Sequence, residues 1–216
     1  MKYSQKWDKR RNNKSNKNSK KNMTKISKSL SYALRHGVIA LGLNMDSEGY
    51  VRLNDLLNHP DLPTLSNVSV DTIKQIVETN DKKRFSLINK KRNIYIRANQ
   101  GHSKTIGNKI NDDLLCTELD SPYEMCIHGT VRSALHEIMK EGLSPMNRKH
   151  IHMAKGLTKD DGVISGMRNT STVYIYINMK AAMDDGIKFY ESDNGVILCA
   201  ERIHPQYFKN IVLCDG

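Results

Sequence analysis

Three short stretches place arginine and histidine together in patterns that could perform phosphate chemistry. Arg35 and His36 are adjacent in "LRHG", Arg97 ends the alternating stretch "YIRA", and Arg148 belongs to "NRKHIHM". A planar guanidinium binds a phosphate dianion through paired hydrogen bonds, and histidine exchanges a proton near neutral pH. Plainer interpretations exist, because cations stabilise helix ends by up to about 1 kcal/mol and a strand arginine is often solvated. These residues alone leave both interpretations open.

The polar stretch "NQGHS" follows the strand that ends in Arg97. Gly101 permits close approach of a ligand to the backbone, while Gln100 and His102 add side-chain donors. This composition is more typical of a ligand-binding loop than of a plain turn. We therefore expect Gln100 and His102 to contact the same phosphate-bearing ligand as Arg97.

The stretch "IHGT" has the features of an anion-binding turn. His128 ends an apolar run, Gly129 follows, and Thr130 is expected to open the next helix. Backbone donors at a helix N-terminus bind anions, and a histidine can hydrogen-bond a ribose hydroxyl. The alternative is a structural histidine beside a threonine that caps the helix.

The alternating stretch "HIHM" places His150 and His152 on one face of an expected strand. Together with His128 they could form a zinc site, or they could line a phosphate and nucleotide site. Lys149 and Arg148 beside them would repel a cation and attract a phosphate. The nucleotide site is therefore the favoured hypothesis, with no metal.

The stretch "DDGVISGMR" is rich in small residues. A flexible loop of this kind could lie against a nucleotide through Ser165, Gly166 and Arg168, or it could be an ordinary connection.

The positive charge of this 216-residue chain is concentrated at its start. Residues 1–25 contain ten Lys/Arg and one acidic residue, so they carry +9 of the formal net charge of +11. They are rich in Asn and Ser and poor in apolar residues, which predicts a disordered basic tail. Such a tail either attracts a polyanion in a salt-dependent way or has no specific role.

The cysteine pattern and the absence of a long apolar run predict an intracellular protein, cytoplasmic or nuclear. Cys116, Cys126, Cys199 and Cys214 have no metal-ligand spacing, which suggests reduced thiols. We also expect no membrane association and a monomer.

The first half of the chain reads as helices followed by a hairpin. Thr24 can cap a helix with an apolar stripe that Gly37 ends, and Ser69 can cap a second helix. Alternating residues on both sides of "NKKRN" predict a hairpin over 85–98. Residues 26–102 thus resemble a winged-helix lobe, and residues 103–121 lack periodicity, which suggests a linker.

The second half, residues 122–216, reads as a strand-rich lobe. Strands are expected in "YEMCIHGT", "HIHM", "TVYIYINM" and "YFKNIVL", with a hairpin around Asp193-Asn194-Gly195 and a helix that Gly142 ends. The predicted fold class is α+β with two lobes.

Taken in order, these stretches resemble the RNA 2′-phosphotransferase family. The similar strings include "LSYALRHG", "YIRANQGHS", "IHGT", "GLSPMNRKHIHM", "DGVISGMR" and "DGIKFYESDNGVIL", spread over roughly residues 26–208. The resemblance implies an N-terminal winged-helix-like RNA lobe and a C-terminal ADP-ribosyltransferase-like, NAD⁺-binding lobe. It also implies removal of an internal 2′-phosphate from tRNA, with NAD⁺ consumed as co-substrate.

The resemblance assigns roles to individual residues. A catalytic quartet maps to Arg35, His36, Arg97 and Arg148. NAD⁺ contacts map to His128, Gly129 and Thr130, and less directly to His150, His152 and the 165–168 loop. Gln100 and His102 would contact RNA or its phosphate. The strand "NGVIL" lacks the glutamate common in enzymes that ADP-ribosylate proteins, which argues against a protein acceptor.

Three other functions compete with this one. The chain could ADP-ribosylate terminal phosphates of nucleic acids, it could be a non-catalytic winged-helix RNA-binding protein, or it could be a metalloenzyme built on the three histidines. Consumption of NAD⁺, the products formed and metal content would separate them.

Overall fold

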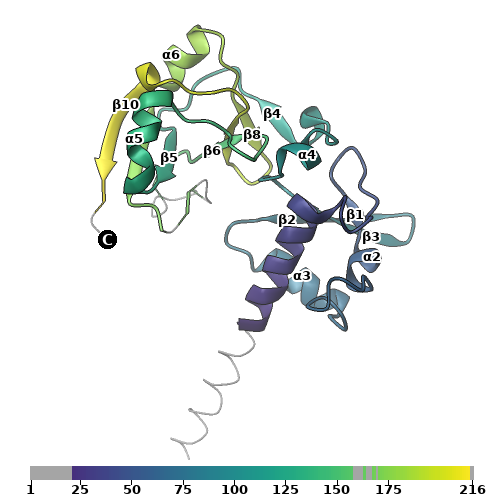
Figure 1. Cartoon of the computed structure of the whole chain (residues 1–216). Helices are drawn as coiled ribbons and strands as arrows, with labels where there is room; N and C mark the ends of the chain where they lie inside the picture. Colours follow the sequence, from purple (N-terminus) through teal and green to yellow (C-terminus); the bar gives the residue numbers. More distant parts are fainter. Residues whose placement is uncertain (1–20, 158–162, 164–166, 169, 215–216) are drawn as a thin grey trace, which may run out of the picture.

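The computed structural model describes residues 21–157, 163, 167–168 and 170–214 (Figure 1). The predicted disordered tail therefore lies outside the described residues, except for 21–25. Those five residues are helical, so the structured part of the chain begins before residue 26.

The first helix covers residues 21–32 and continues as the π-helical turn η1 (Ala33–Gly37). Its predicted apolar stripe is confirmed, because Ile26, Leu30 and Leu34 are buried. Thr24 is not the cap, since residues 21–23 are already helical. The helix does end at Gly37, but the left-handed backbone that closes the turn belongs to Gly42, with φ of 60°.

The rest of the first half consists of a small antiparallel sheet and two helices. The strand order of the sheet is β1-β3-β2, with β1 (Val51–Arg52), β2 (Phe85–Lys90) and β3 (Asn93–Ala98). Helices α2 (Leu53–Leu57) and α3 (Val70–Glu78) complete the unit, and Ser69 caps α3 as predicted. The hairpin prediction is also confirmed. Lys91 and Arg92 form its turn with positive φ, the geometry of a two-residue hairpin loop.

The aperiodic stretch 103–121 is more ordered than its pattern suggests. It contains α4 (Lys104–Gly107), the 3-10 turn η2 (Asp112–Leu114) and strand β4 (Cys116–Glu118). Three apolar residues of this stretch, Ile106, Ile110 and Leu115, form a small core with Val38. The stretch therefore packs against the first half and also supplies a strand to the second.

The second half contains two antiparallel sheets. One has the order β10-β7-β5 and the other β4-β8-β9-β6. The strands are β5 (Ile127–Thr130), β6 (Ile151–Met153), β7 (Val173–Ile177), β8 (Tyr190–Ser192), β9 (Ile197–Cys199) and β10 (Phe208–Leu213). Helices α5 (Arg132–Glu141) and α6 (Met179–Asp184) and the turn η3 (Pro205–Tyr207) pack around them. Gly142 ends α5, as predicted, with φ of 85°.

Each half has its own hydrophobic core. The first is built from the N-terminal helix, α2, α3 and the small sheet, and the second from the strand-rich half. Figure 1 shows the halves side by side, with α4 near the junction. The architecture is thus a mixture of helix and antiparallel sheet, which confirms the α+β class. Among the described residues, no helix has the length and apolarity needed to cross a membrane.

Candidate active site

A cavity of about 720 Å³ lies in the second half, between α5, β5 and the entry to β6. Its walls include Arg148 of the predicted catalytic quartet and most of the predicted nucleotide contacts: His128, Gly129, Thr130, His150, His152 and Arg168. The side of α5 adds apolar surface through Ala134 and Ile138. The lining therefore combines arginines, histidines and two glutamates, Glu137 and Glu141, with apolar surface, and a nucleotide has groups that can use both kinds of contact.

His128 is held in one protonation state by its surroundings. Its Nδ1 lies 3.0 Å from the carbonyl oxygen of His152, which can only accept, so Nδ1 carries the hydrogen. Burial lowers the pKa of His128, although the His152 carbonyl opposes that shift. The ring is consequently neutral near pH 7, which leaves Nε2 as an acceptor for a hydroxyl group.

Gly129 and Thr130 belong to β5 and do not cap the following helix. A Cβ on Gly129 would lie 2.7 Å from Oγ of Ser171, so only glycine fits beside the cavity here. The prediction that Thr130 opens the helix is wrong. Helix α5 begins at Arg132, and its N-cap is Val131, which offers no side-chain oxygen.

His150 and His152 both line the cavity, as their alternation predicted. Their Nε2 atoms are buried and have no hydrogen-bond partner within the described part of the chain. Burial, and next the charge of Arg148, lower the pKa of His152 well below its usual value. A neutral buried ring with an unused nitrogen is suited to a polar ligand group.

Arg35, His36 and Arg148 form a cationic cluster at the edge of this cavity. Nε and Nη2 of Arg35 are shielded from solvent and make no hydrogen bond to any described residue. Burial, followed by the charges of Arg148 and Arg84, lowers the pKa of Arg35 to about 10. Desolvation and then the charges of Arg148 and Arg35 also lower the pKa of His36. Repulsion of this kind is relieved when an anion binds.

Arg97 lies in a different environment from the other members of the predicted quartet. It is buried and does not line the cavity. Its Nη1 donates to the carbonyl oxygens of Glu48 and Leu114, each at 3.1 Å, and its Nη2 forms an ion pair with Asp193. The guanidinium also lies 4.8 Å from the centre of the Tyr50 ring. The structure thus brings three members of the quartet together and engages the fourth elsewhere.

The "NQGHS" loop lies between Arg35 and Arg148, because the Ser103 amide donates to the Arg35 carbonyl and the Ser103 backbone forms a β-bridge with Arg148. Gly101 has φ of 88°, and a Cβ there would lie 3.4 Å from Cζ of Arg35. His102 is buried, and burial, followed by the charge of Arg35, lowers its pKa to about 3. The ring is therefore neutral. Gln100 is half-buried beside them.

The small-residue loop is described only in part. Ser165 and Gly166 lie outside the described residues, whereas Arg168 is exposed and lines the cavity. The backbone carbonyl of Met167 accepts a hydrogen bond from Nζ of Lys82, 3.1 Å away, so this loop contacts the first half of the molecule.

The sequence did not single out Arg84, whose charge acts on Arg35. Its position at the start of β2, in "KKRF", resembles an ordinary solvated strand end. Only the tertiary structure shows that this strand end lies near Arg35.

The geometry does not support the zinc alternative. Among the described residues, no group of three or more His, Cys, Asp or Glu side chains has the arrangement to hold a metal ion.

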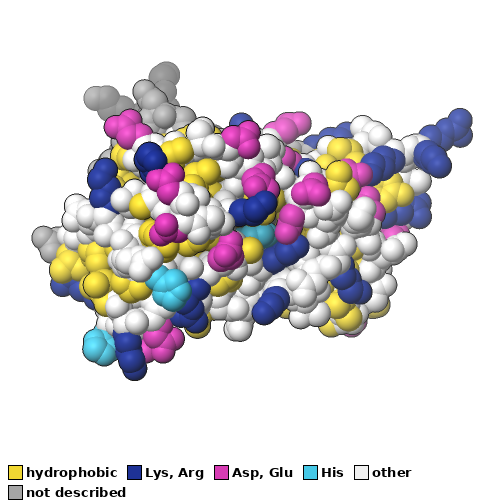
Figure 2. Space-filling view, turned by 90° about the horizontal axis from the view of Figure 1, so that it is seen from above, with side chains coloured by type: hydrophobic (Ala, Val, Ile, Leu, Met, Phe, Trp, Pro, Cys, Tyr) yellow, Lys and Arg dark blue, Asp and Glu magenta, His cyan; other side chains and the backbone are white. Residues whose placement is uncertain are grey.

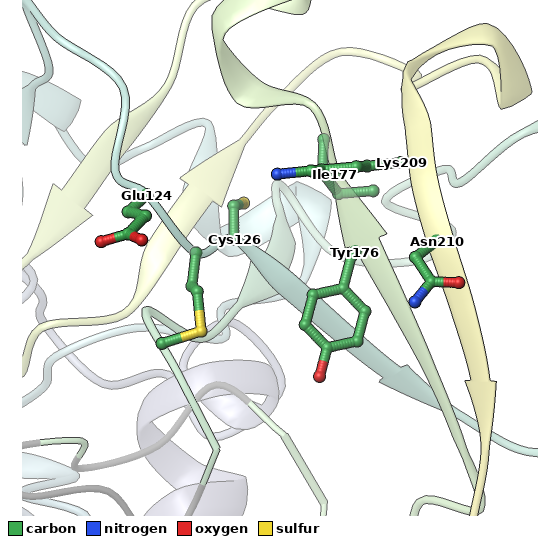
Figure 3. Close-up of a pocket in the computed structure, with 7 residues that line it drawn as sticks. Glu124, Cys126, Tyr176, Ile177, Lys209 and Asn210 are labelled. Atoms are coloured by element: carbon green, nitrogen blue, oxygen red, sulfur yellow. The ribbon is translucent and has the colours of Figure 1, made fainter.

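A smaller cavity, about 230 Å³, lies apart from these residues, between β7, β10 and the segment 124–126 that precedes β5. Figure 3 shows Tyr176 and Ile177 of β7 beside Lys209 and Asn210 of β10 at this cavity. None of the residues predicted to do chemistry lines it.

Comparison with known proteins identifies the class to which this chain belongs. The sequence profile of the RNA 2′-phosphotransferase, Tpt1 / KptA family matches residues 21–201, and the chain is a member of that family. The predicted family is therefore confirmed.

Individual relatives agree with this assignment. The chain is 41% identical over 191 residues to tRNA 2′-phosphotransferase 1 of Danio rerio, covering 86% of this chain and 83% of that protein. It is 39% identical over 180 residues to tRNA 2′-phosphotransferase of Saccharomyces cerevisiae, with 81% and 77% covered. A probable RNA 2′-phosphotransferase of Rhizobium leguminosarum is 35% identical over 186 residues, with 86% and 93% covered.

Proposed function

We propose that this protein removes the internal 2′-phosphate from ligated tRNA by transferring it to NAD⁺. The products are RNA with a free 2′-hydroxyl, nicotinamide and ADP-ribose 1″,2″-cyclic phosphate. Family membership over residues 21–201 supports the phosphate transfer. The structural observation that carries the proposal is Arg35, whose shielded Nε and Nη2 have no partner among the described residues beside the cationic cavity.

The proposed reaction has two steps. In the first, an oxygen of the RNA 2′-phosphate forms a bond to C1″ of the nicotinamide ribose, and the bond to nicotinamide breaks. In the second, the ribose 2″-hydroxyl attacks the phosphorus and loses its proton, and the bond from phosphorus to the RNA 2′-oxygen breaks. That oxygen takes up a proton and becomes the hydroxyl.

In this proposal, Arg35 and Arg148 bind the phosphate and stabilise the charge that develops on its oxygens during transfer. Arginine suits this role because it keeps its charge at neutral pH even where burial and neighbouring cations lower its pKa, as they do for Arg35. Arginines also supply charge where other phosphoryl-transfer enzymes use a divalent ion, so we propose that no metal is required.

His36 is proposed to donate a proton or a hydrogen bond to the departing RNA 2′-oxygen. Desolvation by burial, and next the charges of Arg148 and Arg35, lower its pKa. A bound phosphate dianion reverses that influence, because an opposite charge within a few ångström favours the protonated ring. The ring would therefore become an acid only once substrate is present.

The NAD⁺ molecule is proposed to occupy the 720 Å³ cavity. His128 would accept a hydrogen bond from a ribose hydroxyl through Nε2, and Gly129 would allow close backbone approach. Thr130, His150, His152 and Arg168 complete the proposed contacts, together with Ser165 and Gly166 outside the described residues.

We further propose a winged-helix-like RNA lobe over 26–102, a connecting segment over 103–121 and an ADP-ribosyltransferase-like lobe over 122–216. The helices and hairpin of the first half and the two antiparallel sheets of the second half support this division. Gln100 and His102 would contact RNA near the connection. The basic tail would add salt-dependent RNA affinity, and the protein would act as a monomer inside the cell.

The test is incubation of the full chain with NAD⁺ and an oligonucleotide that carries one internal 2′-phosphate. We expect release of nicotinamide and formation of the cyclic phosphate, and neither with the matched 2′-hydroxyl oligonucleotide. Transfer of ADP-ribose to a 5′-phosphate end, without cyclic phosphate, would support terminal ADP-ribosylation instead. Binding of RNA with no consumption of NAD⁺ would leave only the RNA-binding function.

A further inference from the structure

The stretch between His102 and Leu114 makes close contact with the residues around Arg148. The backbone of Ser103 forms a β-bridge with Arg148, and the amide of Lys104 donates to the carbonyl of Asn147 at 3.1 Å. The amide of Ser103 also donates to the carbonyl of Arg35 at 2.9 Å. This stretch therefore touches the backbone of both arginines of the candidate site.

The side chain of Lys149 extends away from the cavity into this stretch. Its Nζ donates to the carbonyl oxygens of Gly107, at 2.9 Å, and Ile110, at 3.4 Å. It also forms an ion pair with Oδ2 of Asp112 at 2.7 Å. An ammonium group has three hydrogens to donate, so these three acceptors use them all.

Gly107 makes room for the lysine stem. A Cβ at this position would lie 2.7 Å from Cδ and 2.9 Å from Cβ of Lys149. The lysine is thus enclosed along its length as well as bound at its end, which restricts the backbone of the two residues beside it, Arg148 and His150.

Asp112 faces His150 as well as Lys149. Its Oδ2 lies 3.8 Å from Nε2 of His150, and its Oδ1 is buried without a hydrogen-bond partner among the described residues. Burial by itself would raise the pKa of Asp112, but the contacts with His150 and Lys149 outweigh burial and lower it. The carboxylate is therefore ionised at neutral pH between two residues that flank the cavity wall.

We propose that Asp112 is a positioning residue for the reaction. Its carboxylate holds Lys149 and faces His150, and it thereby fixes the backbone that presents Arg148 and His150 to the cavity. Asp112 does not line the cavity, so it acts through these residues rather than on substrate. The inference rests on the proposed function, because the consequence of misplacing Arg148 is loss of phosphate transfer.

The test uses the full chain and the 2′-phosphorylated oligonucleotide with NAD⁺. Asp112→Asn keeps the shape of the side chain and removes its charge. We expect kcat to fall roughly ten-fold, since small misplacement of a catalytic group slows reaction more than it weakens binding. The KM values for NAD⁺ and for the oligonucleotide should stay within about two-fold of wild type.

Two variants control this measurement. Asp113→Asn removes an exposed carboxylate from the same turn and should leave kcat unchanged. Asp112→Glu restores the charge and should recover most of the lost kcat. Recovery by glutamate distinguishes a positioning carboxylate from a residue that only fills space.

Lys149→Met provides an independent route to the same conclusion. If Asp112 acts through Lys149, the double variant should lose little more kcat than Lys149→Met alone. Equal kcat in Asp112→Asn and Asp113→Asn would overturn the proposal, and so would a lower melting temperature with normal kcat per folded molecule. Failure of the wild-type protein to transfer phosphate would instead refute the proposed function.

Discussion

Arg35 and Arg97 are two arginines that come from the same half of the molecule and meet opposite surroundings. Arg35 lies among other cations, and two of its guanidinium nitrogens are shielded without partners in the described chain. Arg97 donates to two backbone carbonyls and pairs with Asp193 across the junction between the halves. A buried donor without a partner costs about 1–3 kcal/mol, and an anion bound beside Arg35 would offset that cost. At Arg97, Nη1 and Nη2 already have acceptors, and only Nε lacks a partner among the described residues.

Two arginines from similar motifs can therefore differ in what they are able to bind, because the acceptors around each guanidinium differ. Both residues belong to the predicted catalytic quartet and to stretches that resemble one family. Arg35 would act on the phosphate directly. The contacts of Arg97 support a contribution through the junction, where it joins Leu114 and Asp193 to the small sheet.

Arg35→Met tests one side of this comparison and has the largest expected effect. Turnover should fall about 1000-fold, because a donor aimed at the transition state is lost. The melting temperature should not decrease, since the substitution removes a repelled charge and retains an apolar stem. Activity assays and thermal denaturation measure both, and Lys28→Met, exposed on the same helix, is the control. A destabilised protein with near-normal turnover would contradict our interpretation of Arg35.

Arg97→Ala tests whether the contacts of Arg97 stabilise the folded protein. We expect a loss of about 2 kcal/mol in the free energy of unfolding, because two carbonyl oxygens lose their donor and Asp193 loses its ion pair. Denaturant titration gives this value. Lys90→Ala is the matched control, since its ion pairs with Asp46 and Glu48 are exposed and worth little. Unchanged stability with abolished turnover would place Arg97 with Arg35 as a direct phosphate ligand.

His102→Gln tests whether the buried ring of His102, in the loop that follows Arg97 and contacts Arg35, is held neutral. The pKa of His102 is lowered to about 3 in the folded protein. As pH falls below about 6.5, the ring therefore takes up a proton in the unfolded protein but not in the folded protein, which favours unfolding. Its contribution to stability is complete above that pH and is lost between about 6.5 and 3.

Between pH 7 and pH 5 the wild-type protein should lose about 2 kcal/mol through this residue, and His102→Gln should lose correspondingly less. His136→Gln, exposed on α5, should leave the pH dependence of stability as it is in wild type. If the free energy of unfolding changed with pH equally in wild type and His102→Gln, the ring would not be held neutral.

Local sequence pattern predicted the elements well and the contacts between them poorly. The hairpin over 85–98, the Ser69 cap and the Gly142 stop were all confirmed, because each depends on residues within a few positions of one another. Thr24 and Thr130 were wrong as caps, because neighbouring residues already belong to a helix or a strand. The ordered stretch 103–121 escaped prediction because its apolar residues face Val38 from a distant part of the chain.

In the candidate site, too, local pattern indicated the residues but not the contacts between distant parts of the chain. His150 and His152 line one cavity together with Arg148, although His150 precedes strand β6, and the roles predicted for these residues and for Arg35 stay predictions. Nothing in the spacing of residues could reveal that Asp193 meets Arg97, or that Asp112 meets Lys149. Those pairs join residues whose separation along the chain carries no periodic signal.

Sequence alone therefore determined the family, the α+β class and the residue types available for phosphate chemistry, since motifs and local periodicity record these. Tertiary structure decided which arginines remain open to a ligand and which are engaged. The physical reason is that hydrogen-bond satisfaction depends on every group that surrounds a buried donor. For Arg97 those groups come from residues 48, 114 and 193, which only folding brings together.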